Sequence, residues 1–210
     1  MPRTKANTHI CLPACNTAGV NEAGTDEAGR GCLAGPVFAA AVILPDGYRL
    51  DGLNDSKQLT ADRRRRLADI IRRDAVAWAV AALDAAEIDR LNILRASLTA
   101  MHRALDGLTV RPGAVIVDGN KFMPYGNVPF TTFVGGDGRF GNIAAASILA
   151  KTERDKFMER ADKEYPGYGW ARNKGYPTAD HRRAIAELGP SPLHRLSFRL
   201  LPLSSPSLFD

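Results

Sequence analysis

Cysteine is scarce in this chain of 210 residues, and no apolar run is long enough to cross a bilayer. Its three cysteines, Cys11, Cys15 and Cys32, are an odd number without a disulfide framework, which favours a reducing, cytoplasmic location. His9 with Cys11 and Cys15 is an incomplete set for structural zinc, which takes four ligands, so we expect no zinc there. A membrane-spanning helix needs about 20 successive apolar residues, so we expect no membrane protein.

Aromatic residues make up only 7% of the chain, but 45% hydrophobic and 24% charged residues are ordinary for a folded globular protein. The length fits one domain with its own core. We therefore expect a flexible tail at residues 1–20, a single domain at 21–200 and a second flexible tail at 201–210. The first tail lacks the apolar core of a secretory leader and the arginine-rich pattern of a transit peptide.

The chain has five more positive than negative charges, and many of its arginines are clustered. Arginines stand together at residues 63–66, 72–73 and 182–183. Such clusters contact a polyanion in one interpretation and form solvated helix faces in another, and the sequence leaves both open.

The spacing of apolar residues predicts both strands and helices. Short apolar runs predict strands at 22–27, 36–44, 75–83, 113–118 and 128–136. Amphipathic spacing predicts helices at 61–73, 85–105, 142–165 and 179–188. Thr60 and Thr178 are the expected N-caps of the first and last helix, and Gly107 ends the second. Early strands with helices concentrated late favour an α/β layered fold, in which helices flank a central sheet and the C-terminal part is helical.

Acidic residues stand at the ends of three predicted strands, each beside glycine. Asp26 and Glu27 precede the turn Gly29-Arg30-Gly31, while Asp118 precedes a glycine and Asp137 follows two. Ligands of α/β sheets gather at strand ends, so we expect the four carboxylates to converge. Carboxylate oxygens suit Mg²⁺ or Mn²⁺, and cations between converging carboxylates relieve their repulsion. The set predicts a two-metal site for phosphodiester chemistry, although Asp118 and Asp137 alone also fit simple Asp-Gly turns.

The acidic pair itself poses a geometric problem. Successive side chains of a regular strand point to opposite faces of the sheet. Asp26 and Glu27 can therefore share a metal only if the strand ends or bulges there, which Gly29 makes feasible.

The segment Gly136–Gly141 matches the glycine pattern of dinucleotide-binding loops. A Tyr-Pro-Gly segment follows the next helix, where a dinucleotide fold would have a second strand with a ribose-binding acid. Asp137 would also place a negative charge against the pyrophosphate. The sequence therefore disfavours dinucleotide binding.

An ordered series of motifs spans most of the chain: AGTDEAGRGCLAGPVFAAAVILP, NDSKQLT, VIVDGN, GGD followed by IAAASILAKTERD, NKGYPTADH and SPLHRLSF. With these motifs the chain resembles the ribonuclease HII family, and the likeness covers about residues 23–198. The resemblance implies a ribonuclease H-like fold with a mixed sheet. It also implies a metal-dependent endonuclease that hydrolyses RNA in RNA–DNA hybrids and cuts 5′ of single ribonucleotides in duplex DNA. Two-metal in-line attack of water would leave 3′-hydroxyl and 5′-phosphate ends.

The resemblance also implies roles for individual residues. The catalytic, metal-binding carboxylates would be Asp26, Glu27, Asp118 and Asp137, holding two Mg²⁺ or Mn²⁺ ions. The turn Gly29-Arg30-Gly31 would recognise the ribose 2′-hydroxyl and the neighbouring phosphate, and Tyr176 would stack on the next deoxyribose. Contacts to the nucleic-acid backbone are expected from Lys57, Ser147, Lys151 and Lys174.

Three positions depart from the family pattern: Cys32 stands at a frequent proline, Asn173 at a frequent histidine, and Thr152-Glu153 at a frequent Val-Thr pair. A ribonuclease HIII-type enzyme is one alternative, although that family has a different pattern after its Asp-Glu pair. A nucleic-acid-binding module with an inactive site is the other, and the intact carboxylates disfavour it. We expect a monomer, and residues 205–210 faintly resemble peptides that bind sliding clamps.

Overall fold

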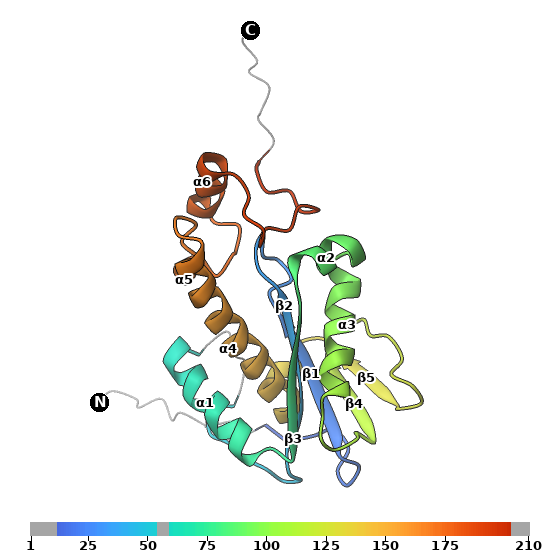
Figure 1. The fold of residues 1–210 in the computed structure, drawn as a ribbon. Helices are drawn as coiled ribbons and strands as arrows, with labels where there is room; N and C mark the ends of the chain where they lie inside the picture. Colours follow the sequence, from blue (N-terminus) through green and yellow to red (C-terminus); the bar gives the residue numbers. More distant parts are fainter. Residues whose placement is uncertain (1–11, 54–58, 203–210) are drawn as a thin grey trace, which may run out of the picture.

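The computed structural model describes residues 12–53 and 59–202, and the strands of these ranges form one five-stranded mixed sheet (Figure 1). The strand order is β3-β2-β1-β4-β5, with β1, β2 and β3 antiparallel and β1, β4 and β5 parallel. The strands are β1 (Glu22–Ala28), β2 (Val37–Ile43), β3 (Ala77–Leu83), β4 (Ala114–Asp118) and β5 (Phe130–Phe133). The predicted α/β class is confirmed.

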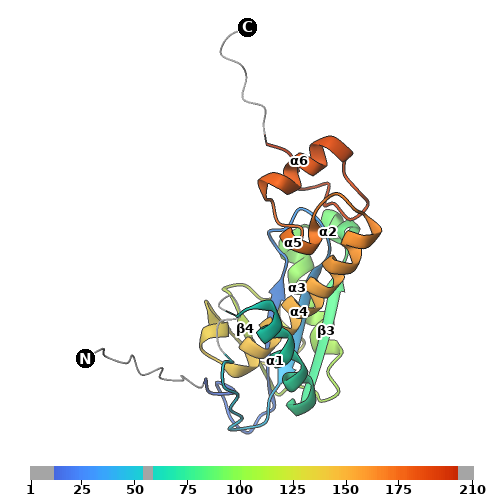
Figure 2. The same cartoon turned by 90° about the vertical axis from the view of Figure 1, so that its left-hand side faces the viewer.

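Helices cover both faces of the sheet. They are α1 (Ala61–Asp74), α2 (Ala85–Leu91), α3 (Ile93–Asp106), α4 (Gly141–Glu164), α5 (Trp170–Asn173) and α6 (Ala179–Leu188). Ala40 and Val42 of β2 pack in a core with α1 and α4, whereas Ala39 and Ala41 pack in a second core with α3. Helix α5 packs beside the C-terminal end of α4, with Trp170 in one cluster with Met158 and Ala161, and α6 stands above the sheet, as the turned view shows (Figure 2). None of the helices in the described ranges is apolar over a length that would cross a bilayer.

Helix α4 lies unusually close to β1. A Cβ at Gly24 would come within 2.2 Å of the carbonyl carbon of Asn142, so the contact requires glycine. The buried side chain of Asn142 donates to the carbonyl of Glu22 at 2.7 Å and accepts from the N–H of Leu44 at 2.8 Å. These bonds fix the start of α4 to the beginning of β1 and to the residue that follows β2, and the rest of the helix then runs beside β1.

The helix expected at 85–105 is two helices, so that prediction is wrong. The chain breaks at Asn92, which has a left-handed φ of 65°. With a ψ of 160° this conformation is strained for a residue that has a side chain, and here the side chain caps α3 by accepting from the N–H of Arg95 at 3.1 Å. Between the predicted helices at 142–165 and 179–188, where no helix was predicted, the chain forms the short helix α5.

Part of the expected N-terminal tail packs against the domain. Leu12 and Ala14 are buried in the core beside α1 and α4, and the carbonyls of Pro13 and Ala14 accept from the first N–H groups of α4 at 2.7 and 2.8 Å. Packing thus begins before residue 21, and we propose that the domain starts at or before Leu12. His9 and Cys11, like the tail peptide 205–210, lie outside the described residues.

The arginines of α1 meet acids of α4, which lie far away in the sequence. The pairs are Arg64–Asp155 at 2.8 Å, Arg65–Glu159 at 2.8 Å and Arg72–Glu153 at 2.5 Å. Neither contact with a polyanion nor a solvated helix face fully describes the arginine clusters, because three of their arginines join α1 to α4 through ion pairs. The Arg65–Glu159 pair is exposed and the other two are part-buried, and together they orient α1 against α4.

Candidate active site

Asp26 and Glu27 stand at the point of β1 where its pairing with β4 has ended. Strands β1 and β4 pair as far as Thr25↔Val117, while β1 and β2 stay in register as far as Ala28↔Phe38. Asp118, the last residue of β4, therefore lies beside an open edge of β1. No bulge separates Asp26 from Glu27, contrary to one of the two expected solutions. The strand also continues through both residues to Ala28, so it does not end at the pair, which was the other expected solution; the opening comes instead from the loss of the pairing with β4 after Thr25.

A cavity of about 240 Å³ opens at this strand end. Its lining unites all four predicted carboxylates with the predicted turn, Tyr176 and Lys151. The lining residues are Asp26, Glu27, Ala28, Gly29, Arg30, Gly31, Asp118, Asp137, Lys151 and Tyr176. Residues up to 150 positions apart in the sequence thus meet where the parallel strands end, as the strand-end argument predicts.

Asp26 is only 5% exposed and faces α4. It accepts from the N–H of Glu27 at 2.7 Å and from the hydroxyl of Ser147, which in turn accepts from Lys151 at 3.1 Å. Burial, followed by the nearby carboxylates of Glu27 and Asp118, raises the pKa of Asp26 to about 8. Ser147 and Lys151 oppose this rise without cancelling it, so the site holds excess negative charge.

The other carboxylates are held from different elements. Glu27 forms an ion pair with Arg30 at 3.1 Å, yet burial still raises its pKa. Asp118 accepts from the N–H of Gly136 at 2.8 Å, which ties the end of β4 to the 3₁₀ turn Gly136–Gly138. That turn carries Asp137, which is 5% exposed and lines the same cavity.

The donor set fits a hard divalent cation. As they stand in the described part of the chain, no three acidic, histidine or cysteine side chains converge closely enough to hold a metal ion. Mg²⁺, however, binds through one or two carboxylates and keeps several waters, for which the cavity has room. Burial, the main cause, raises the pKa values of both Asp26 and Glu27, and a bound cation would stabilise their ionised forms.

Two of the predicted backbone contacts, Ser147 and Lys174, do not line the cavity, and a third is not described. Ser147 is fully buried and contacts Asp26, so it orients that carboxylate and does not meet a substrate. The ammonium of Lys174 pairs with Glu159 at 2.9 Å. Lys57 lies outside the described residues.

Two buried arginines that the sequence analysis did not single out hold the turn in place. Arg154, on α4, donates to the carbonyls of Ala34, Pro36 and Lys174. Its Nε would lie 2.0 Å from a Cβ at Gly29, whose φ is +94°. Arg195 donates to the carbonyls of Arg30 and Gly35 at 2.8 to 3.0 Å. Arg154 lies four residues from the buried Ala150 and Met158, a helical spacing that was visible in the sequence.

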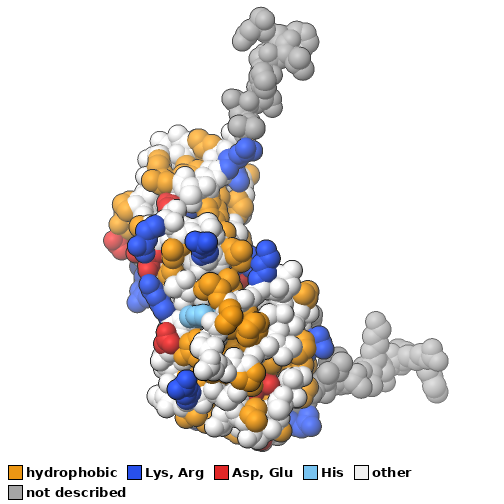
Figure 3. Space-filling view, turned by 90° about the vertical axis from the view of Figure 1, so that its right-hand side faces the viewer, with side chains coloured by type: hydrophobic (Ala, Val, Ile, Leu, Met, Phe, Trp, Pro, Cys, Tyr) orange, Lys and Arg blue, Asp and Glu red, His pale blue; other side chains and the backbone are white. Residues whose placement is uncertain are grey.

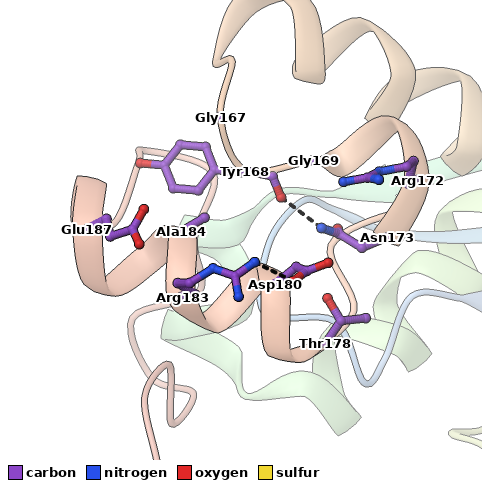
Figure 4. A pocket seen from close by; sticks show the side chains of 10 residues that line it. All are labelled: Gly167, Tyr168, Gly169, Arg172, Asn173, Thr178, Asp180, Arg183, Ala184 and Glu187. Carbon is purple, nitrogen blue, oxygen red and sulfur yellow. Dashed lines mark hydrogen bonds and ion pairs between the residues drawn. The ribbon is translucent and has the colours of Figure 1, made fainter.

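A larger cavity, of about 530 Å³, lies between α5, α6 and the loop before α5 (Figure 4). Its two acids come from α6, and one of them, Asp180, already pairs with Arg183. The cavity lacks a cluster of carboxylates, so its size does not make it the reactive site. Its wall is informative for another reason: Asn173 donates to the carbonyl of Tyr168 at 2.7 Å and shapes the loop that leads to Tyr176.

Comparison with known proteins gives consistent results. The family model described as Ribonuclease HII matches residues 23–201. A ribonuclease HII of Bacteroides thetaiotaomicron is 58% identical over 180 residues, which cover 86% of this chain and 90% of that protein. A ribonuclease HII of Parabacteroides distasonis is 56% identical over 193 residues, covering 92% and 96%.

Solved structures share the fold. Ribonuclease H2 of Pyrococcus horikoshii OT3 has a TM-score of 0.70 at 24% identity, covering 85% of this chain and 94% of that one. The RNase HII solved with PCNA from Archaeoglobus fulgidus has a TM-score of 0.67 at 25% identity, covering 83% and 92%. Bst-RNase HIII, solved in complex with Mn²⁺, is 21% identical with a TM-score of 0.63, covering 86% and 68%. The much higher identity to ribonucleases HII decides between the sister families. The chain therefore belongs to the ribonuclease HII family and is a ribonuclease H endonuclease.

Proposed function

We propose that this endonuclease, besides hydrolysing the RNA strand of RNA–DNA hybrids, cuts 5′ of single ribonucleotides embedded in duplex DNA. The observation that carries the proposal is the single cavity that unites four carboxylates, the turn Gly29-Arg30-Gly31 and Tyr176. Hydrolysis needs the carboxylates, discrimination of a ribonucleotide needs a sensor of the 2′-hydroxyl, and recognition of a junction needs a group that contacts the next sugar.

The turn has the properties of a 2′-hydroxyl sensor. Gly29 is required by the protein itself, because Arg154 occupies the space of a Cβ. Gly31 is exposed, and a Cβ there would meet no protein atom within 4 Å. Its lack of a side chain therefore leaves room for a ligand to approach the backbone. A 2′-hydroxyl both donates and accepts hydrogen bonds, so backbone groups can detect it.

The carboxylates would hold Mg²⁺ or Mn²⁺, two ions during cleavage, which supply the charge that activates the attacking water and stabilises the departing 3′ oxygen. Ser147 and Lys151 orient Asp26 from beneath, so this carboxylate keeps one direction. Arg30 is half-exposed beside Glu27 and is free to turn toward a phosphate. Lysine and arginine side chains also gather across the middle of one face of the molecule (Figure 3), as a nucleic-acid backbone requires.

Cleavage of a duplex with one ribonucleotide tests the proposal. With Mg²⁺ or Mn²⁺ we expect a single cut 5′ of the ribonucleotide, with 3′-hydroxyl and 5′-phosphate ends. Asp118→Asn should lose nearly all turnover and still bind the duplex, while the exposed Asp51→Asn serves as the matched control. Cutting of an all-DNA duplex, or an active Asp118→Asn, would contradict the proposal.

Tyr176 is 49% exposed at the cavity rim, and one side of its ring lies over Arg154 at 5.9 Å. The other side is available to stack on the deoxyribose that follows the ribonucleotide. Tyr176→Ala should reduce cleavage of the single-ribonucleotide duplex more than cleavage of a continuous hybrid, whereas Tyr176→Phe keeps the ring and should retain the preference. An equal loss on both substrates would exclude the junction role.

We also propose that the C-terminal peptide 205–210 binds a sliding clamp, since the RNase HII of Archaeoglobus fulgidus was solved in a complex with PCNA. This peptide lies outside the described residues. Deleting its six residues should abolish capture by an immobilised clamp and leave cleavage unchanged. Gel filtration of the full chain tests the predicted monomer.

A further inference from the structure

Two buried histidines form a hydrogen-bonded chain that ends on the backbone of Tyr176. The Nδ1 atom of His181 lies 2.9 Å from the carbonyl oxygen of Tyr176, and its Nε2 lies 3.2 Å from Nε2 of His194. Trp170 donates to Nε2 of His181 at 2.9 Å, and the N–H of Ser191 donates to Nδ1 of His194 at 2.8 Å. The chain thus joins three separate segments of the C-terminal part.

The partners determine where each histidine carries its hydrogen. A carbonyl only accepts, so Nδ1 of His181 is the protonated nitrogen, and its Nε2 accepts from Trp170. Nε2 of His194 must then be the donor of the bond between the rings, which leaves its Nδ1 to accept from Ser191. One pair of neutral tautomers therefore gives every bond a donor and an acceptor, with Trp170 and His194 sharing the one lone pair of His181 Nε2. Burial lowers the pKa of both rings, that of His194 to about 4, so both are neutral at pH 7.

The other end of the chain is attached to the segment that follows the turn Gly29–Gly31. His194 forms a β-bridge with Ala34. On either side of it, Gly35 donates to the carbonyl of Leu193 at 2.8 Å, and Arg195 donates to the carbonyl of Leu33 at 2.9 Å. The paired histidines therefore span the distance from the turn segment to Tyr176.

We propose that His181 and His194 are positioning residues that fix Tyr176 relative to the turn and thereby set the preference for a ribonucleotide–deoxyribonucleotide junction. This inference rests on the proposed stacking role of Tyr176. Other bonds already join the two parts: the N–H of Leu33 donates to the carbonyl of Gly175 at 2.8 Å, and Arg154 donates to the carbonyls of Ala34 and Lys174. These bonds reach the residues before Tyr176, whereas the histidine chain holds the carbonyl of Tyr176 itself and so restricts its rotation.

Two uncharged substitutions of His181 distinguish the loss of its hydrogen bond to Tyr176 from the loss of the ring. Asparagine places its amide nitrogen near the position of Nδ1 and keeps the donor to Tyr176, whereas glutamine reaches the position of Nε2 and loses that donor. The quantity to measure is the ratio of kcat/KM for a single-ribonucleotide duplex to kcat/KM for a continuous hybrid. His181→Gln should lower this ratio about tenfold, as expected for one lost hydrogen bond, and His181→Asn should restore most of it. Equal ratios in both variants would overturn the proposal.

A double-mutant cycle with Tyr176→Ala distinguishes a failure of the positioning role of His181 from a failure of the stacking role of Tyr176. In that background His181→Gln should not lower the ratio further, and an added loss would overturn the positioning role. If Tyr176→Ala lowers the ratio and His181→Gln does not, only the positioning inference fails; if Tyr176→Ala has no effect, the stacking role fails and the inference fails with it. The tautomers are checked in the unaltered protein by ¹⁵N NMR of the histidine rings, and any assignment other than Nδ1–H for His181 with Nε2–H for His194 would refute the hydrogen-bonded chain.

Discussion

The carboxylate cluster should destabilise the metal-free protein, and Asp26→Asn should relieve this cost. Asparagine keeps the shape of the side chain and an oxygen for the N–H of Glu27, while it removes the buried charge. The substitution should abolish cleavage, since Asp26 lines the reactive cavity. We therefore expect a variant that is inactive and more stable than the parent protein at alkaline pH.

The magnitude follows from the pKa of Asp26, which rises from 3.8 to about 8 in the folded chain. Between these values the folded state holds a proton that the unfolded state has lost, so the stabilisation is complete below pH 3.8 and is lost as the pH rises to about 8. From pH 5 to pH 9 the loss is at most about 4 kcal/mol, at about 1.36 kcal/mol per pH unit. Water from the cavity hydrates the ionised carboxylate, so we expect about 2 kcal/mol.

Urea unfolding with a chelator at pH 5 and pH 9 measures this difference. The gain in free energy of unfolding of Asp26→Asn over the parent should grow between the two pH values, and saturating Mg²⁺ at pH 9 should narrow it. Asp51→Asn, at an exposed position, should show no such growth. A pH-independent difference, or a less stable variant at pH 9, would refute the electrostatic argument.

Other predictions concern packing and acid stability. Gly29→Ala should lose about 3 kcal/mol of unfolding free energy and all cleavage, because the added Cβ would meet Arg154. Gly31→Ala should lose less than about 0.5 kcal/mol of unfolding free energy and still weaken substrate binding. Chemical unfolding measures the loss of stability and binding assays measure the loss of affinity. Gly24→Ala should cost at least about 3 kcal/mol, measured as a lower Tm, because its Cβ would overlap the backbone of α4. His194 has its pKa lowered from 6.5 to about 4, so the unfolded chain takes up a proton first and stability falls as the pH drops through this window. The free energy of unfolding should fall by at most about 3 kcal/mol between pH 7 and pH 4, and by about 2 kcal/mol after solvent screening. In urea titrations at these two pH values, His194→Gln should show a smaller fall than the parent protein.

Features set by neighbouring residues were predictable from the sequence. Thr60 and Thr178 cap α1 and α6, each accepting from the N–H three residues on, as their position before an amphipathic run predicts. The four carboxylates converge because strand ends of a sheet lie together, which the pattern of apolar runs followed by acid and glycine already shows.

Features that depend on distant partners were not predictable. Arg64 pairs with an acid 91 residues away, and no local pattern connects the two. Arg195 was missed because arginine in a polar C-terminal stretch normally points to solvent, whereas here it is fully buried among backbone carbonyls. Asn92 illustrates a local failure: one residue of left-handed φ outweighs the helical preference of the twenty residues around it.

From the division of the site we expect the C-terminal part to be needed for specificity. The sheet carries Asp26, Glu27 and Asp118, because all three stand on its strands β1 and β4. The turn has no such support, since it follows the last pair of β1 and contains an exposed glycine. Arg154 and Arg195 provide that support through six hydrogen bonds to backbone carbonyls, and in the described ranges neither guanidinium pairs with a carboxylate. The N–H groups of these guanidiniums bind backbone carbonyls. Substitutions in the C-terminal part should therefore alter which nucleotide is recognised before they alter the positions of the carboxylates that cut it.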